Sequence, residues 1–236
     1  MALSLSLRRK KKDHLTEKQR SLITHFSPKS PVTEQYRTIR TNIQFSSVEE
    51  PAKVITVTST APGEGKSTTA ANLAIVFAQQ DNRVLLVDGD LRKPTSHYTF
   101  QADNKRGLTN VLTNQAALTD VSQKTLVPKL DLLTCGPIPP NPAELLASKR
   151  MDWVLQEAKK HYDYIIVDTP PVLAVTDAQI LANKTDGVVL VTSNGMTTKD
   201  NAKKAKELLT NASARILGVV LNRKDKASGQ YYYYGD

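Results

Sequence analysis

Residues 54–68 read VITVTSTAPGEGKST, an apolar β-branched run that passes through a glycine-rich loop into a helical pattern. Gly63 and Gly65 leave room for the backbone to wrap a phosphate, and the loop N–H groups and the helix N-terminus supply donors. Lys66 can reach terminal phosphates, and Ser67 is the expected Mg²⁺ ligand. A glycine turn that only opens a helix is the alternative, but a strand before the loop and a helix after it favour a nucleotide site. The predicted phosphate-binding residues are Pro62, Gly63, Glu64, Gly65, Lys66, Ser67 and Thr68.

Short apolar runs alternate with helical segments from residue 54 onward. Most of the runs are nearly continuous, which is typical of strands covered on both faces. The pattern predicts an α/β fold with a doubly wound, mostly parallel sheet flanked by helices, as in P-loop NTPases with a deviant Walker loop. The expected strands are residues 54–57, 84–87, 164–167, 188–191 and 216–221, and the expected helices are residues 66–79, 151–160, 176–182 and 199–209.

Two of these strands end in carboxylates, at the sheet edge where such folds bind ligands. Asp88 and Asp90 follow one strand, and Asp168 follows another. An aspartate that ends a strand is often only a turn or cap residue, but three acids beside a phosphate loop favour a site for Mg²⁺ and a γ-phosphate. We assign Asp88 as a base and Asp90 and Asp168 as Mg²⁺ ligands, with the roles of Asp88 and Asp90 open to exchange.

Four consecutive tyrosines stand two residues from the end of the sequence, and they are the predicted phosphate acceptors Tyr231, Tyr232, Tyr233 and Tyr234. Tyrosine rings are usually buried or docked, so this cluster is not typical of a solvated tail. With a phosphate loop in the same chain, it indicates phosphate transfer from a nucleotide to tyrosine. Lys66, Asp88 and Asp90 are then the expected catalytic residues.

Length and composition predict one α/β domain, because 236 residues with 39% apolar content can form a substantial core. Residues 1–30 hold eight Lys or Arg and two Asp or Glu, within a chain of net charge +9. Such an arm is either drawn to anionic lipid or simply solvated, and no interleaved aromatics support binding of a specific nucleic acid. We expect a flexible basic arm over residues 1–31, a domain over 32–222 and a flexible tail over 223–236.

The compartment is expected to be the cytoplasm. The single cysteine, Cys135, excludes an internal disulfide and fits a reducing environment. No apolar run approaches the roughly 20 residues that cross a bilayer, and the first residues do not have the charge order of a secretory signal.

Residues 33–45 have the pattern of an amphipathic helix with Thr33 as its cap. The predicted apolar face holds Tyr36, Ile39 and Ile43, and the predicted opposite face holds Glu34, Arg37 and Arg40. From the pattern alone, Glu34 and Arg37 form a surface pair worth a few tenths of a kcal/mol.

The sequence resembles the bacterial tyrosine kinases, the P-loop kinases of capsule and exopolysaccharide systems. Residues 62–67 are similar to their Walker A motif, residues 87–92 to Walker A′ and residues 166–171 to Walker B. Residues 34–40 resemble the E-x-x-R-x-x-R helix through which these kinases assemble rings. With the tyrosine cluster, the resemblance covers nearly everything from residue 32 onward.

This resemblance implies an ATP- and Mg²⁺-dependent tyrosine autokinase, in which each tail is phosphorylated in trans within a ring-shaped homo-oligomer. It also implies a membrane adaptor of the polysaccharide co-polymerase type, a cognate phosphotyrosine phosphatase, and polysaccharide-assembly enzymes as further substrates. The expected form is the split Gram-positive one, held at the inner face of the cell membrane through its adaptor.

Two other classes of protein share parts of this pattern. A partition- or division-type ATPase has the same fold and acids but a signature lysine early in the loop, where this chain has Ala61. A non-catalytic adaptor that only binds ATP is disfavoured by the intact loop and acids. The loop also departs from the general pattern at Thr60, which replaces its first glycine.

Overall fold

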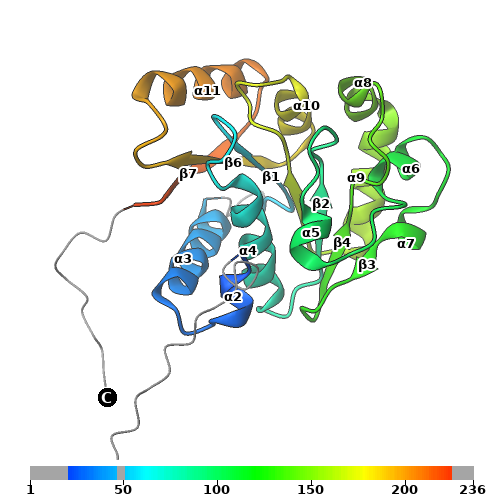
Figure 1. The fold of residues 1–236 in the computed structure, drawn as a ribbon, viewed down its shortest axis with the longest axis horizontal. Helices are drawn as coiled ribbons and strands as arrows, with labels where there is room; N and C mark the ends of the chain where they lie inside the picture. Colours follow the sequence, from blue (N-terminus) through cyan, green and yellow to red (C-terminus); the bar gives the residue numbers. More distant parts are fainter. Residues whose placement is uncertain (1–20, 47–50, 225–236) are drawn as a thin grey trace, which may run out of the picture.

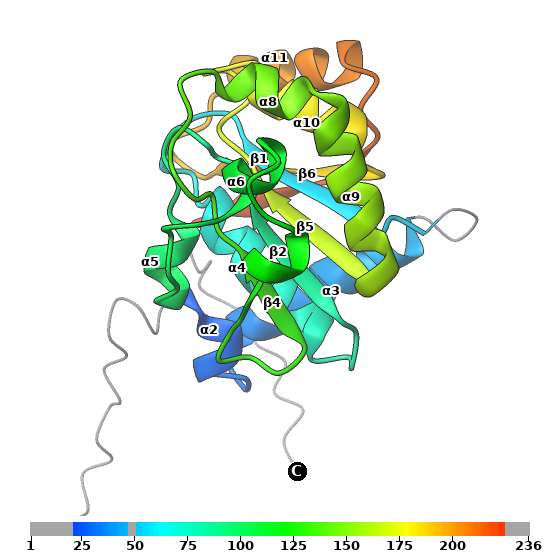
Figure 2. The ribbon, with the colours of Figure 1, turned by 90° about the vertical axis from the view of Figure 1, so that its right-hand side faces the viewer.

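The computed structural model describes residues 21–46 and 51–224, which form a seven-stranded sheet with helices on both faces (Figures 1 and 2). The strand order is β3-β4-β2-β5-β1-β6-β7, and all neighbours are parallel except β3 and β4. The strands are β1 (Val54–Ser59), β2 (Val84–Asp88), β3 (Gln123–Lys124), β4 (Leu130–Leu133), β5 (Tyr164–Asp168), β6 (Gly187–Ser193) and β7 (Ile216–Asn222). The predicted fold class is confirmed.

The helices that accompany the sheet differ widely in length. The long ones are α3 (Pro31–Phe45), α4 (Lys66–Ala78), α9 (Lys149–His161), α10 (Asp177–Lys184) and α11 (Lys199–Asn211). The short ones are α2 (Ile23–Phe26), α5 (Ser96–Phe100), α6 (Leu108–Leu112), α7 (Leu118–Val121) and α8 (Pro142–Ala147). Helices α2, α3 and α4 gather on one face, and α9, α10 and α11 lie on the other (Figures 1 and 2).

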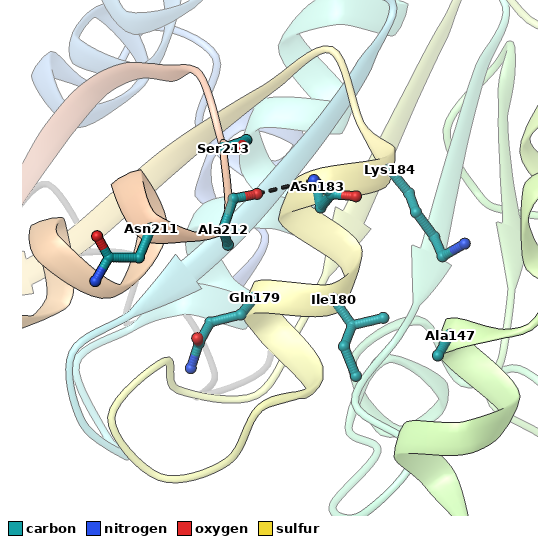
Figure 3. Close-up of a pocket in the computed structure, with 8 residues that line it drawn as sticks. All are labelled: Ala147, Gln179, Ile180, Asn183, Lys184, Asn211, Ala212 and Ser213. Carbon is teal, nitrogen blue, oxygen red and sulfur yellow. Dashed lines mark hydrogen bonds between the residues drawn. The ribbon is translucent and has the colours of Figure 1, made fainter.

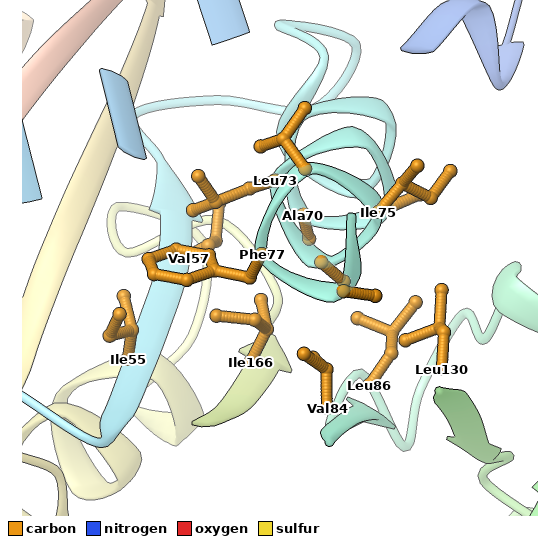
Figure 4. Close-up of a cluster of buried hydrophobic side chains, with 14 of the residues drawn as sticks. Ile55, Val57, Ala70, Leu73, Ile75, Phe77, Val84, Leu86, Leu130 and Ile166 are labelled. Atoms are coloured by element: carbon orange, nitrogen blue, oxygen red, sulfur yellow. The ribbon is translucent and has the colours of Figure 1, made fainter. Parts of the chain in front are cut away.

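Helix α4 is the centre of the larger core (Figure 4). All of its residues from 69 to 78 are buried, because the sheet covers one side of the helix and α2 and α3 cover the other. The Phe77 ring lies 4.2 Å from the Tyr164 ring, centroid to centroid, and burying such a side chain stabilises a fold by about 1.5–3 kcal/mol. This packing fixes the N-terminus of α4, where the phosphate loop ends.

Residues 21–31, which were expected in the flexible arm, pack against α4. Leu22 is fully buried, and both the backbone N–H and the hydroxyl of Thr24 donate to Oδ1 of Asn72, at 3.0 and 2.8 Å. These buried contacts make the segment part of the domain, so the domain begins before residue 32.

Helix α3 differs from its prediction in its N-cap residue and in the side of the helix on which Arg40 lies. Its N-cap is Ser30 rather than Thr33, because Pro31 supplies the φ angle of a first helical residue and the Ser30 hydroxyl accepts from the N–H of Val32. Thr33 is instead buried and donates to the carbonyl of Ser27. Arg40 follows Tyr36 by four residues, which places both on the side of the helix that faces the domain.

The elements between residues 96 and 147 have no clear signature in the local sequence pattern. Helices α5 to α8 are too short to show a helical period, and the run of β4 is interrupted by Asp131. Helix α8 begins at Pro142, directly after a proline-rich loop.

Candidate active site

The phosphate loop joins β1 to α4 and ends at Gly65, the N-cap of the helix. Gly63 and Gly65 have φ angles of 81° and 97°, in the left-handed region that favours glycine. A Cβ on Gly65 would lie 2.2 Å from Nδ2 of Asn222, so a side chain is also excluded by space. The loop thus presents the N-terminus of α4 at the carboxyl end of β1, the arrangement that binds phosphate oxygens.

Lys66 stands at the start of α4 and faces two carboxylates. Its Nζ lies 3.1 Å from Oδ2 of Asp90 and 3.5 Å from Oδ1 of Asp168. Burial alone would lower the pKa of Lys66, but attraction to Asp168 and Asp90 outweighs burial and raises it. The ammonium is therefore fully charged and held where terminal phosphates would enter.

The structure brings the predicted acids to one edge of the sheet because β2, β5 and β1 are neighbours. Asp88 lies directly opposite Asp168 in the parallel register, and both are almost completely buried. Burial raises the pKa of Asp168 to about 7, against the opposing effect of Lys66 and with the support of Asp88. Burial likewise raises the pKa of Asp88, although hydrogen bonds from Ser96 oppose the change.

Asp88 and Asp90 also shape the loop that follows β2. Oδ2 of Asp88 accepts from the hydroxyl and the N–H of Ser96, at 2.5 and 3.0 Å, and from the N–H of Thr95 at 3.1 Å. Oδ1 of Asp90 accepts from the N–H of Lys93 at 3.0 Å. Asp88 therefore keeps one buried oxygen, Oδ1, without a hydrogen-bond partner.

The residues at this edge fit a divalent cation completed by phosphate oxygens. Oδ1 of Asp168, like that of Asp88, is buried without a hydrogen-bond partner, and the Ser67 hydroxyl accepts from Nζ of Lys66 at 3.1 Å. Among residues 21–46 and 51–224, no group of three or more His, Cys, Asp or Glu side chains could hold a metal ion by itself. Carboxylate and hydroxyl oxygens such as these, together with phosphate oxygens, are the ligands that Mg²⁺ takes in phosphoryl-transfer enzymes.

Comparison with known proteins gives the same family from sequence and from structure. A family model described as an AAA domain matches residues 52–211. Tyrosine-protein kinase YwqD of Bacillus subtilis is 53% identical over 226 residues, 95% of either chain, and Tyrosine-protein kinase CpsD of Streptococcus agalactiae is 41% identical over 86% of this chain and 89% of that one. The chain belongs to the bacterial tyrosine kinases.

Solved structures separate this kinase from the division ATPases. The chimerical protein CapA2B2 matches with a TM-score of 0.84 and 47% identity over 87% of this chain and 90% of that one. The kinase domain of Escherichia coli ETK matches with a TM-score of 0.85 and 34% identity over 97% and 89%. MinD of Pyrococcus horikoshii with Mg-ADP is more distant, with a TM-score of 0.64 and 26% identity over 75% and 72%. The family prediction is therefore confirmed.

Glu64 differs from the other predicted phosphate-binding residues of the kinase. Its carboxylate is 1% exposed and accepts hydrogen bonds from Thr60 and Ala61 within the loop. Only the backbone of Glu64 can serve a phosphate. The hydroxyl of Thr60 explains the departure from glycine at that position, because it donates to Glu64 at 2.6 Å.

Two residues of this edge were missed or weakly assigned from the sequence. Asp177, fully buried at the start of α10, accepts a two-pronged ion pair from Arg92, at 2.8 and 3.0 Å. Asn222, the second of these residues, ends β7. Its amide donates to the carbonyl of Glu64 at 2.9 Å and its Oδ1 accepts from the N–H of Arg223 at 2.8 Å, so the side chain is engaged within the protein.

The three residues of the predicted oligomerisation motif do not lie together. Glu34 and Arg37 form an ion pair on the outer side of α3. Arg40 instead turns toward α4 and donates to the carbonyl of Val76 at 2.6 Å. The acceptors Tyr231 to Tyr234 lie outside the described residues.

A pocket lies away from this edge. It has a volume of about 430 Å³ between α8, α10 and α11 (Figure 3). Its lining is Ala147, Gln179, Ile180, Asn183, Lys184, Asn211, Ala212 and Ser213. None of the predicted site residues borders it, so it is not part of the kinase site. In the described part of the chain, no helix is both long and apolar enough to cross a membrane.

Proposed function

We propose that this kinase binds ATP at the phosphate loop and transfers its γ-phosphate to Tyr231 to Tyr234 of a neighbouring copy. The observation that supports this most is the position of Lys66, held between Asp90 and Asp168 at the N-terminus of α4. A lysine charged and fixed there binds the terminal phosphates, and the buried acids beside it can take part in proton transfer.

In the transfer, a tyrosine oxygen attacks the γ-phosphorus, the bond to the β–γ bridging oxygen breaks, and ADP leaves. The phenol, with an unperturbed pKa near 10, benefits from a base that accepts its proton as the new bond forms. Asp88 is our candidate, because its Oδ1 has no hydrogen-bond partner and its raised pKa makes the carboxylate a stronger base. Lys66 and the loop N–H groups bind the charge that develops on the phosphates.

Ser67, Asp90 and Asp168 are the residues proposed to hold Mg²⁺, directly or through water. The ion supplies positive charge that offsets the triphosphate. Asp90 accepts from Nζ of Lys66 through Oδ2 and from the N–H of Lys93 through Oδ1, so its carboxylate is held in a fixed orientation beside Lys66.

The partners of the kinase and its assembly into a ring are also part of this proposal. Glu34 and Arg37 lie on the outer side of α3, where a neighbouring copy in a ring can reach them. A membrane adaptor of the polysaccharide co-polymerase type would activate the kinase and hold it at the inner face of the membrane. A phosphotyrosine phosphatase would reverse the modification, and polysaccharide-assembly enzymes would be further substrates in capsule or exopolysaccharide synthesis.

Intact-mass and phosphotyrosine measurements on protein expressed in bacteria test the central proposal. Wild type should carry several phosphates, whereas Lys66→Met and a variant with Tyr231 to Tyr234 changed to Phe should carry none. Mixing these two variants with ATP and Mg²⁺ tests transfer in trans, because the Phe variant keeps its site and the Lys66→Met variant keeps its tail. A wild type without phosphate even after addition of ATP, Mg²⁺ and an adaptor tail would refute the proposal.

A further inference from the structure

Glu64 is at the centre of a hydrogen-bond network that no phosphate-binding pattern requires. Its Oε2 accepts from the N–H groups of Thr60 and Ala61, at 2.8 and 3.0 Å. Its Oε1 accepts from the hydroxyls of Thr60 and Thr197. Two of the donors belong to the loop backbone itself, so the carboxylate closes the phosphate loop from inside.

Thr197 brings the loop after β6 into this network. Its hydroxyl donates to Glu64 and also accepts from the N–H of Ser193 at 2.8 Å, which fixes the orientation of the hydroxyl. Met196, one residue earlier, approaches the phosphate loop at Gly63, where a Cβ would be 3.9 Å from the end of the Met196 side chain. The loop after β6 therefore lies against the phosphate loop.

Asn222 attaches the end of β7 to the same position. Its Nδ2 donates to the carbonyl of Glu64 at 2.9 Å, and its own carbonyl accepts from the N–H of Asn194 at 2.9 Å. Side chain and backbone of Glu64 are thus both tied to the ends of neighbouring strands.

We propose that Glu64 is a positioning residue, which Thr197 and Asn222 hold so that the phosphate loop has its anion-binding shape before a nucleotide arrives. A negative side chain in a phosphate loop opposes nucleotide binding unless its charge is buried and satisfied by donors, as it is here. A loop ordered in advance avoids the entropy cost of ordering at the moment of binding. Loss of the network should therefore weaken nucleotide affinity more than turnover at saturation.

A pair of neighbouring threonines offers a matched test. Thr197→Val removes the hydroxyl that donates to Glu64, and Thr197→Ser restores it. Thr198→Val removes a hydroxyl one residue later, which caps α11 by accepting from the N–H of Asn201 and makes no contact with the phosphate loop. Titration of the full chain with a fluorescent ADP and Mg²⁺ gives Kd for each variant, and thermal unfolding reports whether each is folded.

Thr197→Val should raise the Kd for ADP about tenfold, as expected for loss of a hydrogen bond to a charged group. Thr197→Ser and Thr198→Val should stay within about twofold of wild type, although Thr198→Val melts at a lower temperature because a cap is lost. Glu64→Gln should weaken ADP binding at least as much as Thr197→Val. In kinase assays, KM for ATP should rise more than kcat falls.

Wild-type ADP affinity in a folded Thr197→Val protein would overturn the inference, whatever Glu64→Gln does. Equal weakening in Thr197→Val and Thr198→Val would overturn it as well, because that result reports general destabilisation. The inference rests on the proposed nucleotide site but not on the tyrosine acceptor. A wild type that binds ADP but forms no phosphotyrosine would refute the kinase proposal and leave this one standing.

Discussion

Replacing Arg92 with methionine should destabilise the domain by about 2–3 kcal/mol, a cost set by the carboxylate that it leaves behind. Asp177 has no exposed surface, and Arg92 contacts it through two nitrogens at 2.8 and 3.0 Å. Breaking a buried ion pair by removing one partner costs about 3–5 kcal/mol. The Arg92 side chain is 41% exposed, so water can replace part of it, and the N-terminus of α10 favours the remaining negative charge by about 0.3–1 kcal/mol.

Thermal and urea unfolding of the nucleotide-free protein provide the assay. For a domain of this size, the expected loss lowers the melting temperature by roughly 5–10 °C. Asp177→Asn removes the uncompensated charge, so the double variant Arg92→Met with Asp177→Asn should recover part of the loss. Lys93→Met is the matched control, since Lys93 is exposed and forms no ion pair within residues 21–46 and 51–224.

A loss below about 1 kcal/mol would show that water fully solvates Asp177 once Arg92 is gone. Strict additivity of the two substitutions would show that the ion pair does not couple them. Either result would refute the reasoning that removal of Arg92 leaves the buried carboxylate of Asp177 without compensation.

Three further predictions follow from the same edge of the sheet and from the core. Asp168→Asn should abolish kinase activity and raise the melting temperature of the nucleotide-free protein at pH 8. Burial raises the pKa of Asp168 to about 7, so the cost of burying its charge is absent below the unfolded pKa near 4 and develops as the pH rises through about 7. The melting temperature of the variant should therefore exceed that of wild type by a margin that grows from pH 5 to pH 8. Asp88→Asn should reduce transfer to tyrosine at saturating ATP while ADP binding persists, and full transfer by Asp88→Asn beside loss in Asp90→Asn would reverse the assignment of the base. Arg40→Ala should lower the melting temperature by roughly 2–4 °C, since the carbonyl of Val76 loses its partner. Arg37→Ala breaks only an exposed ion pair, so it should leave the melting temperature of dilute protein unchanged. It should instead change the assembly of the protein, measured by light scattering.

The site residues that the sequence located are those whose positions follow from chain direction. Parallel strands present their carboxyl ends at one edge, so acids that end β2 and β5 had to meet near the phosphate loop if the strands were neighbours. The register places Asp88 opposite Asp168, and Lys66 reaches both Asp90 and Asp168. The local pattern located these residues, and the strand order β2-β5-β1 supplied the one condition that it could not, that the strands are neighbours.

The position of Arg40 was predicted wrongly from the sequence. The helical pattern was interpreted as placing Arg40 on the outer face with Glu34 and Arg37, but a spacing of four residues from Tyr36 places it nearly above that ring on the helix. A long side chain with a polar end can pack its stem against a domain and still find an acceptor. Here the acceptor is the carbonyl of Val76 in the last turn of α4, where a helix leaves carbonyls without internal partners.

The partners of Glu64 could not have been predicted from the sequence, because the contact with Thr197 joins residues 133 positions apart. Within the loop, the only local signal was Thr60, an apparent departure from the glycine pattern that is a donor to Glu64. Thr60 and Glu64 are therefore coupled: the residue that replaces the first glycine of the general pattern donates a hydrogen bond to a buried carboxylate of the same loop. If so, Thr60→Gly should raise the Kd for ADP toward the value of Glu64→Gln, although it restores the general pattern, and the double variant should bind ADP no more weakly than Glu64→Gln alone. A Thr60→Gly protein with wild-type affinity would mean that the hydroxyl only fills space.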